Sequence, residues 1–350
     1  MNNAFFLTKW FYLAMRWIYE NLLSLTGWQA SFVIVLTIAI FTLLIRLLTV
    51  FSDISSRKST AKMTAIQPDL QRLQKKYGND PQKLNLEQQK LMKEKGVSAF
   101  GGCLPLLITM PLFFIFISAF RAWSNEQMLK LLLIMSDNQQ AGIELFNSYK
   151  FGWILNIWRP DNLTSTAVLT GEQFWTTFAQ TKGSYIHEFV YYTENQAVFE
   201  ELLLKMGFYV KDAAGALTIA ADKTAFLAAY EEIMGPCIDQ YAGYVNGIGI
   251  LPILAGITSF LSSWLMMRNQ PKADESNPNA NTGKSMMYIM PIMSVFFCWQ
   301  YDATFGLYWV FSNIFATVSS MIITKKMPEI LAKSEEKQAR KLARMKEQNK

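Results

Sequence analysis

The chain has 350 residues, of which 51% are hydrophobic, 14% are aromatic and only 17% are charged. Soluble domains usually carry about 25% charged residues, so the composition excludes an ordinary soluble enzyme and favours a membrane protein. The formal net charge of +6 indicates a negatively charged partner.

Residues 1–27 combine aromatic and leucine side chains at helical spacing with three interrupting charges, Lys9, Arg16 and Glu20. This pattern favours an amphipathic helix that lies at the outer membrane surface over a helix that crosses the membrane. A cleaved signal peptide is the alternative. We expect the segment to be retained, because it has no small-residue cleavage site after a compact apolar core and no cysteine that could be lipidated.

The first membrane-spanning helix is expected at residues 28–51, where Arg46 is the only ionisable side chain. At about 1.5 Å per residue, a helix of this length crosses a hydrocarbon core of roughly 30 Å. Four further spans are expected, at residues 101–123, 243–267, 286–300 and 304–324. The last two form a helical hairpin whose turn carries Asp302. The sequence therefore predicts an all-α polytopic membrane protein with five transmembrane helices.

The loops predict the orientation of these spans. Segment 52–100 and the tail 325–350 are rich in Lys and Arg, whereas segment 124–242 has more acidic than basic residues. Basic loops stay on the cytoplasmic side. We therefore expect an extracytoplasmic N-terminus, a cytoplasmic C-terminus and a second cytoplasmic loop at 268–285.

The cytoplasmic segment 52–100 carries a helical hairpin in this interpretation. Apolar residues recur at intervals of three and four, and the Gly-Asn-Asp-Pro sequence 78–81 ends one helix and begins another, at Pro81 to Lys95. The apolar residues of the first helix are Met63, Ile66, Leu70, Leu73 and Tyr77. Two interpretations stay open: a solvated connector, or a basic docking surface.

The extracytoplasmic segment 124–242 is expected to be mostly helical. Residues 194–206 and 223–234 have amphipathic helical patterns, with a hairpin or loop at 210–218 between them. Residues 151–161 are rich in aromatics, as is typical of a membrane interface. No function follows from this segment.

Three motifs, in this order, resemble those of the YidC family of membrane protein insertases. They are AKMTAIQPDLQRLQKKYGND in the hairpin, GVSAFGGCLPLLITMPLFFIF at the second span, and MMYIMPIMSVFFCW with GLYWVFSNI near the end. The resemblance is to the short bacterial form, which is related to the insertases of mitochondria and chloroplasts. It covers all five expected spans and the hairpin, but not the extracytoplasmic segment or the tail.

The resemblance implies five helices around a hydrophilic groove that opens to the cytoplasm and to lipid. A single arginine of the first core helix supplies the positive charge of this groove, and Arg46 matches that position. A charge inside a membrane costs about 2.5 to 3.5 kcal/mol on insertion scales, so it usually faces water or a partner. No acidic residue lies within the five expected spans. The alternative is that Arg46, roughly 8 Å from the cytoplasmic boundary, extends its side chain to the membrane surface.

Other polar side chains at membrane depth are candidates for the same client-binding groove. They are Thr49, Ser118, Gln300, Tyr308, Trp309, Ser312 and Asn313. The chain departs from the family at two places: Ser262 and Ser263 stand where a Gln often lies in the third span, and Ser98-Ala99 replaces the usual Asn-Pro.

The resemblance implies an insertase that receives nascent membrane proteins from the cytoplasm in its positively charged groove and releases their helices into the lipid bilayer. Its implied partners are these nascent proteins, the ribosome, the signal recognition particle receptor and the Sec translocon. The tail 325–350 is expected to be disordered or transiently helical, and to bind ribosomal RNA or anionic lipid. The alternative function is a small-solute or anion transporter that binds its substrate at Arg46.

An enzymatic function finds no motif in the sequence. His187 is the single histidine, no GxxxxGK[ST] phosphate-binding loop occurs, and the three cysteines are odd in number. We therefore expect no catalytic residues, no metal site and no cofactor.

Overall fold

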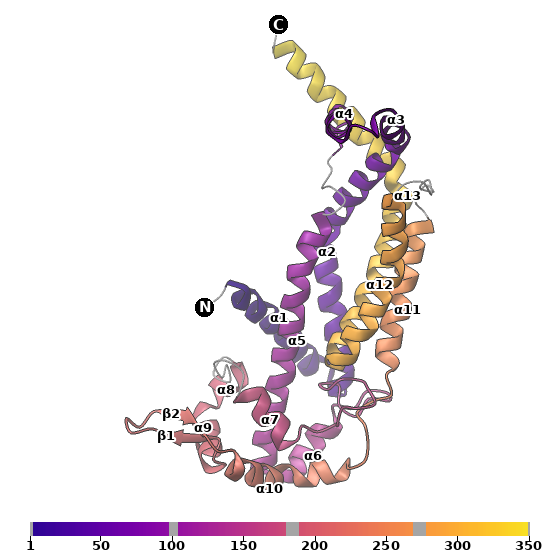
Figure 1. The fold of residues 1–350 in the computed structure, drawn as a ribbon. Coiled ribbons are helices and arrows are strands. Elements are labelled where there is room, and N and C mark those ends of the chain that lie inside the picture. The colour runs from indigo at the N-terminus through magenta and orange to yellow at the C-terminus, as the bar shows by residue number, and fades with distance from the viewer. Residues whose placement is uncertain (1–2, 98–103, 180–188, 269–277, 349–350) are drawn as a thin grey trace. The chain divides into compact units, whose positions relative to one another are not determined.

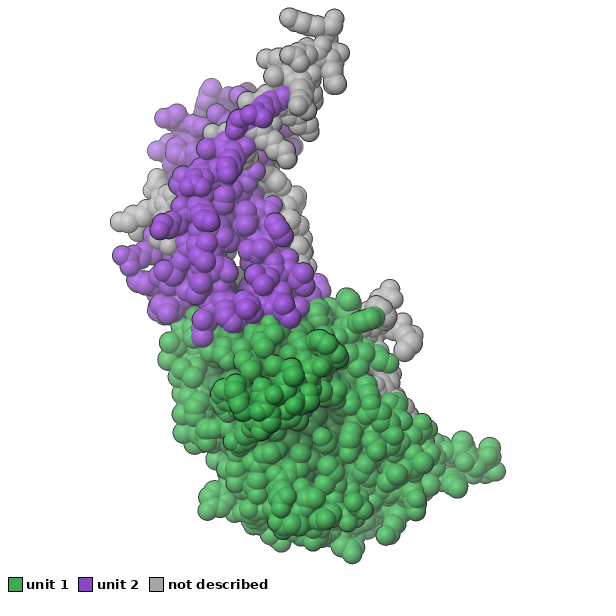
Figure 2. All heavy atoms as spheres, turned by 180° about the vertical axis from the view of Figure 1, so that it is seen from behind, with its two compact units in different colours: residues 1–41, 115–259, 289–311 green, residues 42–114, 260–288, 312–350 purple. Residues whose placement is uncertain are grey.

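The computed structural model describes residues 3–97, 104–179, 189–268 and 278–348. Half of the expected loop 268–285, the end of the expected segment 52–100, His187 and Cys103 lie outside these ranges. The described chain is mostly helical, with thirteen helices and one two-stranded hairpin (Figure 1). It divides into two compact units (Figure 2). Unit 1 comprises residues 1–41, 115–259 and 289–311, and unit 2 comprises residues 42–114, 260–288 and 312–350.

The longest helices alternate with groups of short elements along the chain. The long ones are α1 (Asn3–Thr26), α2 (Ala30–Ala65), α5 (Leu104–Asp137), α11 (Ile250–Arg268), α12 (Pro278–Gln300) and α13 (Ala303–Gln348). The shorter elements are α3 (Gln67–Tyr77), α4 (Pro81–Glu94), α6 (Gln139–Asn147), α7 (Gly171–Phe178), α8 (Val190–Glu194), α9 (Gln196–Lys205), β1 (Tyr209–Lys211), β2 (Leu217–Ile219) and α10 (Thr224–Gln240).

Two helices of the described chain are long and apolar enough to cross a membrane, Ala30–Ala65 and the part of α13 at Ala303–Lys333. Shorter apolar helices lie at Ile250–Leu265 and Met287–Gln300. These helices support a polytopic all-α membrane protein. The number of five spans stays a prediction.

The long apolar helices place large apolar side chains outward and small polar ones inward. On α2, Leu48 and Phe51 are 76% and 79% exposed, whereas on α12 the hydroxyl-bearing Ser294 is fully buried. The other exposed apolar residues of these helices include Leu44, Leu47, Ile253, Ile257, Phe260, Tyr288, Ile292, Phe296, Ile314, Val318 and Met321. Water would oppose this arrangement and lipid would favour it. The exposure pattern therefore supports membrane insertion independently of hydropathy.

In unit 1, residues 167–244 form an inserted segment with its own aromatic core. The two ends of this segment meet, because Thr166 forms an antiparallel bridge with Val245. Helices α7 and α10 pack together, and their core residues include Phe174, Trp175, Phe208, Phe226 and Tyr230, with ring centroids about 5 to 6 Å apart. Helices α9 and α10 and the β1–β2 hairpin lie where the sequence predicts two helices and a hairpin.

Asp161 holds the first turn of α11. Its fully buried carboxylate accepts hydrogen bonds from the backbone N–H groups of Gly249 at 3.0 Å and Leu251 at 2.7 Å, and from Nε1 of Trp153 at 3.0 Å. The first N–H groups of a helix have no partner inside the helix, and the helix dipole favours a negative charge there. Asp161 therefore fixes where α11 begins.

The loop that carries Asp161, residues 157–162, also forms hydrogen bonds with the turn between α12 and α13. The side chain of Asn162 donates to the carbonyl oxygen of Trp299 at 2.7 Å. The backbone N–H groups of Ala303 and Thr304 donate to the carbonyl oxygens of Arg159 and Ile157, at 3.0 and 3.2 Å. Loop 157–162 thus joins the ends of three apolar helices within unit 1.

Within unit 1, a buried polar cluster joins α1 to α5 and α8. Glu126 of α5 accepts hydrogen bonds from the hydroxyl of Tyr12, the guanidinium of Arg16 and the backbone N–H of Tyr191. Arg16 also forms an ion pair with Glu194 at 3.1 Å. These contacts direct Arg16 inward, whereas Glu20 of the same helix stays exposed.

In unit 2, α3 and α4 form a hairpin whose apolar residues, apart from the exposed Leu86, are half-buried and whose lysines are exposed. Asp80 caps α4 by accepting a hydrogen bond from the N–H of Lys83 at 3.1 Å. The helix is interrupted at Ile66, because Pro68 in the first turn of α3 has no backbone N–H and cannot continue the hydrogen bonding of α2. The expected single helix face from Met63 to Tyr77 is therefore divided between two helices.

Three helices continue past the ends expected for their spans: α2 to Ala65 instead of residue 51, α5 to Asp137 instead of residue 123, and α13 to Gln348 instead of Thr324. Helix α12 begins at Pro278, before its expected start at residue 286. A hydropathy pattern predicts that a span ends where charged residues begin. The helix itself continues as long as its backbone hydrogen bonds form and its residues have good helix propensity. The tail, expected to be disordered or transiently helical, is a continuation of α13.

Candidate functional site

Arg46 has a defined partner within unit 2. Its Nη2 atom donates a hydrogen bond to Oγ of Ser312 on α13 at 2.5 Å. Ser312 is 7% exposed, whereas the Arg46 side chain is half-buried. A hydroxyl accepts a hydrogen bond but carries no charge, so the positive charge of Arg46 is held in place without being neutralised by Ser312.

Thr49 and Asn313 lie on the same two helices, in unit 2. Thr49 is one turn beyond Arg46 on α2 and donates to the Arg46 carbonyl oxygen at 3.3 Å. Asn313 follows Ser312 on α13 and is half-buried. The structure thus gathers four of the eight expected groove residues in unit 2.

The other four expected groove residues belong to unit 1, and they differ in their surroundings. Ser118 and Gln300 are exposed, and Trp309 is half-buried. Tyr308 is 8% exposed and packs against Phe116 and Phe120, with ring centroids 4.8 and 5.4 Å apart. The sequence suggested a groove position for Tyr308 because of its hydroxyl group, whereas its ring is part of an aromatic cluster.

A chain of hydrogen bonds in unit 1 joins Trp309 to two serines that the sequence did not single out. Nε1 of Trp309 donates to Oγ of Ser259 at 3.3 Å, and Ser259 bonds Oγ of Ser294 at 2.7 Å. Near these serines, α11 and α12 approach closely: a Cβ atom at Gly256 would lie 2.6 Å from a Val295 methyl group. Small and hydroxyl-bearing residues allow close packing of membrane helices.

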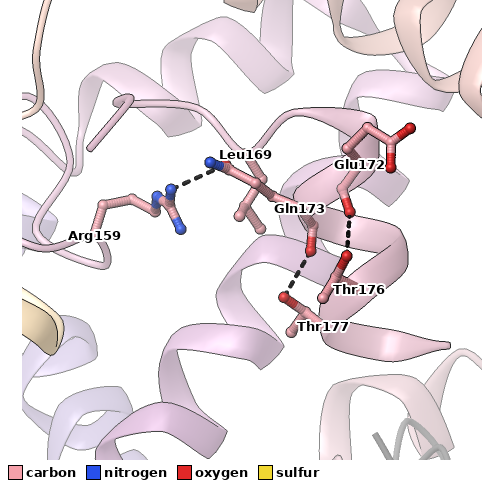
Figure 3. A pocket seen from close by; sticks show the side chains of 6 residues that line it. All are labelled: Arg159, Leu169, Glu172, Gln173, Thr176 and Thr177. Carbon is pink, nitrogen blue, oxygen red and sulfur yellow. Dashed lines mark hydrogen bonds between the residues drawn. The ribbon is translucent and has the colours of Figure 1, made fainter. Parts of the chain in front are cut away.

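A shallow pocket of about 340 Å³ in unit 1 offers no comparable site (Figure 3). The Arg159 side chain points at Gln173 and donates to its Oε1 atom at 3.0 Å (Figure 3). Thr176 and Thr177 donate their hydroxyls to carbonyl oxygens of α7 itself. The arginine and both hydroxyls are thus bonded to neighbours, and we assign no ligand to this pocket.

Asp302, in the turn between α12 and α13, is the most perturbed carboxyl group near the loop 157–162. Burial raises its pKa to about 6, against the opposite influence of the Ser124 hydroxyl and of Arg159 and Arg121. Burial also lowers the pKa of Arg159. The sequence predicted a turn that carries Asp302, and Asp302 lies between the end of α12 and the start of α13.

The model of the family described as 60Kd inner membrane protein matches residues 26–330. A protein of Clostridium perfringens named membrane protein insertase YidC is 34% identical over 148 residues, which is 42% of this chain and 53% of the relative. The chain belongs to the YidC family.

Two other YidC relatives extend this comparison. A Clostridium tetani protein is 45% identical over 86 residues, covering 25% of this chain and 38% of the relative. A Pelodictyon phaeoclathratiforme protein is 26% identical over 306 residues, covering 87% of this chain and 36% of the relative. The matched parts thus span about a third to a half of the relatives' lengths.

Membership of the YidC family and the apolar helices support a protein of the bacterial membrane. The family match starts at residue 26 and stops at residue 330. It therefore leaves out nearly all of the expected N-terminal helix 1–27 and most of the tail 325–350. Nothing in the family match points to an enzymatic activity. Within the described residues, no three His, Cys, Asp or Glu side chains are grouped as a metal site would require.

Proposed function

We propose that this chain is a membrane protein insertase that receives nascent proteins from the cytoplasm and releases their helices into the bilayer. The observation that carries the proposal is Arg46, a cation on an apolar helix whose nearest hydrogen-bond partner is the neutral Ser312. Membership of the YidC family supports the same reading, because its named relatives are insertases.

The mechanism follows from the cost of moving polar chain through lipid. Each unsatisfied backbone group costs several kcal/mol in hydrocarbon, and an acidic side chain adds more. A cation in a hydrated groove offers an acidic flank of a client a favourable intermediate position. Since the attraction is screened by water, the client is held weakly enough to move on.

Within unit 2, the proposed groove has Arg46 at its centre, with Thr49, Ser312 and Asn313 beside it on the same two helices. The four candidates of unit 1 stay predictions from the sequence: Ser118, Gln300, Tyr308 and Trp309. A client helix would leave the groove along the outward apolar faces of the long helices, which are in contact with lipid.

The α3–α4 hairpin is the proposed receiving surface on the cytoplasmic side. Its exposed residues include Lys75, Lys76, Lys93 and Lys95, which suit the phosphate groups of a ribosome or the acidic surface of a targeting receptor. The ribosome, the signal recognition particle receptor and the Sec translocon are its proposed partners. In this orientation the N-terminus is extracytoplasmic and the tail is cytoplasmic.

Crosslinking a ribosome-stalled nascent membrane protein tests the proposal. Photoreactive residues would replace Ser312 and, as a lipid-facing control on the same helix, Val318, which is 50% exposed. We expect client adducts at position 312 before the client helix is complete, and adducts at 318 only with complete helices. Adducts at neither position would contradict an insertase, and uptake of a small anion that depends on Arg46 would favour a transporter.

A further inference from the structure

A polar strip runs along one face of α2 from the expected groove into the basic part of the helix. It consists of Arg46, Thr49, Asp53 and Arg57, at intervals of three, four and four residues, and all four side chains are half-buried. Residues at these intervals share one helix face. The opposite face carries the exposed Leu48 and Phe51.

Asp53 stands between the two arginines of this strip. Seven residues separate it from Arg46, about 10 Å along the helix axis, and four residues separate it from Arg57. Its carboxyl group is within electrostatic reach of both guanidinium groups. The sequence had found no acidic partner for Arg46, because Asp53 lies two residues beyond the expected end of the span.

We propose that Asp53 is a fixed counter-charge that opposes the binding of acidic client segments at Arg46 and so sets how strongly they are held. The proposal rests on the insertase function. With Asp53 ionised, the three charges of the strip sum to +1; without it, they sum to +2. A negative charge about 10 Å from a client carboxylate weakens the binding of that carboxylate about twofold at an effective dielectric constant of about 80, and about fifteenfold at about 20.

An alternative role for Asp53 is purely structural. An aspartate four residues before an arginine stabilises a helix slightly, whatever the client. The two roles differ in one observable. A counter-charge changes the retention of acidic clients and leaves neutral clients alone, whereas a helix-stabilising pair affects both clients equally through the amount of folded protein.

The experiment compares two single-span clients in vesicles that contain the full chain. Their N-terminal tails differ only in three Asp residues against three Asn residues, and a photoreactive residue at Val50 reports client retention. We expect Asp53→Asn to increase adducts of the acidic client about two- to fifteenfold, less at high salt, and to leave the neutral client unchanged. Asp53→Glu should behave like the unmodified chain.

Asp69→Asn is the matched control. It removes one negative charge from the same unit, where Asp69 pairs with Arg72 at 3.4 Å on α3, away from the strip. We expect it to change neither client. In an Arg46→Ala background, Asp53→Asn should lose most of its effect, because acidic clients are no longer held near Asp53.

The outcomes separate the two proposals. If Arg46→Ala removes the acidic-client adduct but Asp53→Asn leaves it unchanged, or changes both clients equally, the counter-charge is overturned and the insertase stands. If the unmodified chain forms adducts with neither client, the insertase function is overturned, and the counter-charge with it.

Discussion

Arg46 donates a hydrogen bond to Ser312 across 266 residues of sequence, which ties α2 to α13 in unit 2 at 2.5 Å. The bond orients the guanidinium group, and among the described residues Ser312 is the side-chain partner found for it. A single neutral acceptor fixes the position of the charge at little cost to its strength. This relationship leads to the first prediction.

Ser312→Ala should weaken the insertion of acidic clients by about two- to tenfold, less than the loss of Arg46 itself. The reason is that hydrogen bonds to charged groups contribute about 1.5 to 3 kcal/mol when buried, and less beside water. The measurement is the insertion rate of an acidic-tailed client in reconstituted vesicles. Ser320→Ala, which removes a similarly buried hydroxyl from the same helix, is the control. Equal rates for both variants would mean that Ser312 does not position Arg46.

Asp161→Asn should destabilise unit 1 by about 2 to 4 kcal/mol. An amide keeps one acceptor but turns an NH₂ group toward N–H donors, which leaves buried polar groups unsatisfied. Thermal unfolding in detergent, followed by tryptophan fluorescence, measures the effect, and the exposed Asp239→Asn is the control. A midpoint that does not differ between the two variants would show that the start of α11 does not depend on this carboxylate.

Asp302 should make stability depend on pH. Its pKa is about 6 in the folded chain and near 3.8 when unfolded, so the folded state binds the proton more tightly. The contribution of Asp302 to the free energy of unfolding is therefore greatest below pH 4. It falls by about 3 kcal/mol in total as the pH rises to above 6. Asp302→Asn should remove this decline and be the more stable chain at pH 8. Unfolding midpoints of both chains between pH 4 and 8 test it, and parallel curves would refute the assignment.

Removal of residues 339–350 should weaken co-sedimentation with ribosomes at low salt, because the tail's basic residues release counterions from RNA. Since α13 extends to Gln348, the basic residues of the tail are carried on a continuous helix. A full-length chain with Lys341, Arg344 and Lys346 replaced by Gln should behave like the truncation. Unchanged co-sedimentation of both chains, with reduced binding to anionic vesicles, would assign the tail to lipid instead.

The sequence predicted the elements that depend on local pattern. A lone arginine in an apolar run, a 3,4 apolar repeat and a Gly-Asn-Asp-Pro break are visible within about 20 residues, and Arg46 and the α3–α4 hairpin were found in this way. The family motifs then indicated the function that we propose. Membership of the family is confirmed by the comparisons.

Other features depend on contacts or on helix continuity that hydropathy does not register. The partner of Arg46 lies 266 residues away, and a serine in an apolar helix gives no signal of which neighbour it meets. Asp53 was missed because the span was ended at its first charges, although following the helical period past residue 51 would have placed it on the face of Arg46. Tyr308 was assigned by its hydroxyl, whereas its ring determines its position.

The central claim is that the positive charge of Arg46 attracts acidic segments of clients. The most direct measurement is the insertion rate of matched clients with acidic and neutral tails by the unmodified chain, Arg46→Lys and Arg46→Ala, each present in equal folded amounts. We predict that Arg46→Lys retains most of the insertion of the acidic client, that Arg46→Ala loses it, and that the neutral client is affected less. Normal insertion of the acidic client by Arg46→Ala would contradict the account.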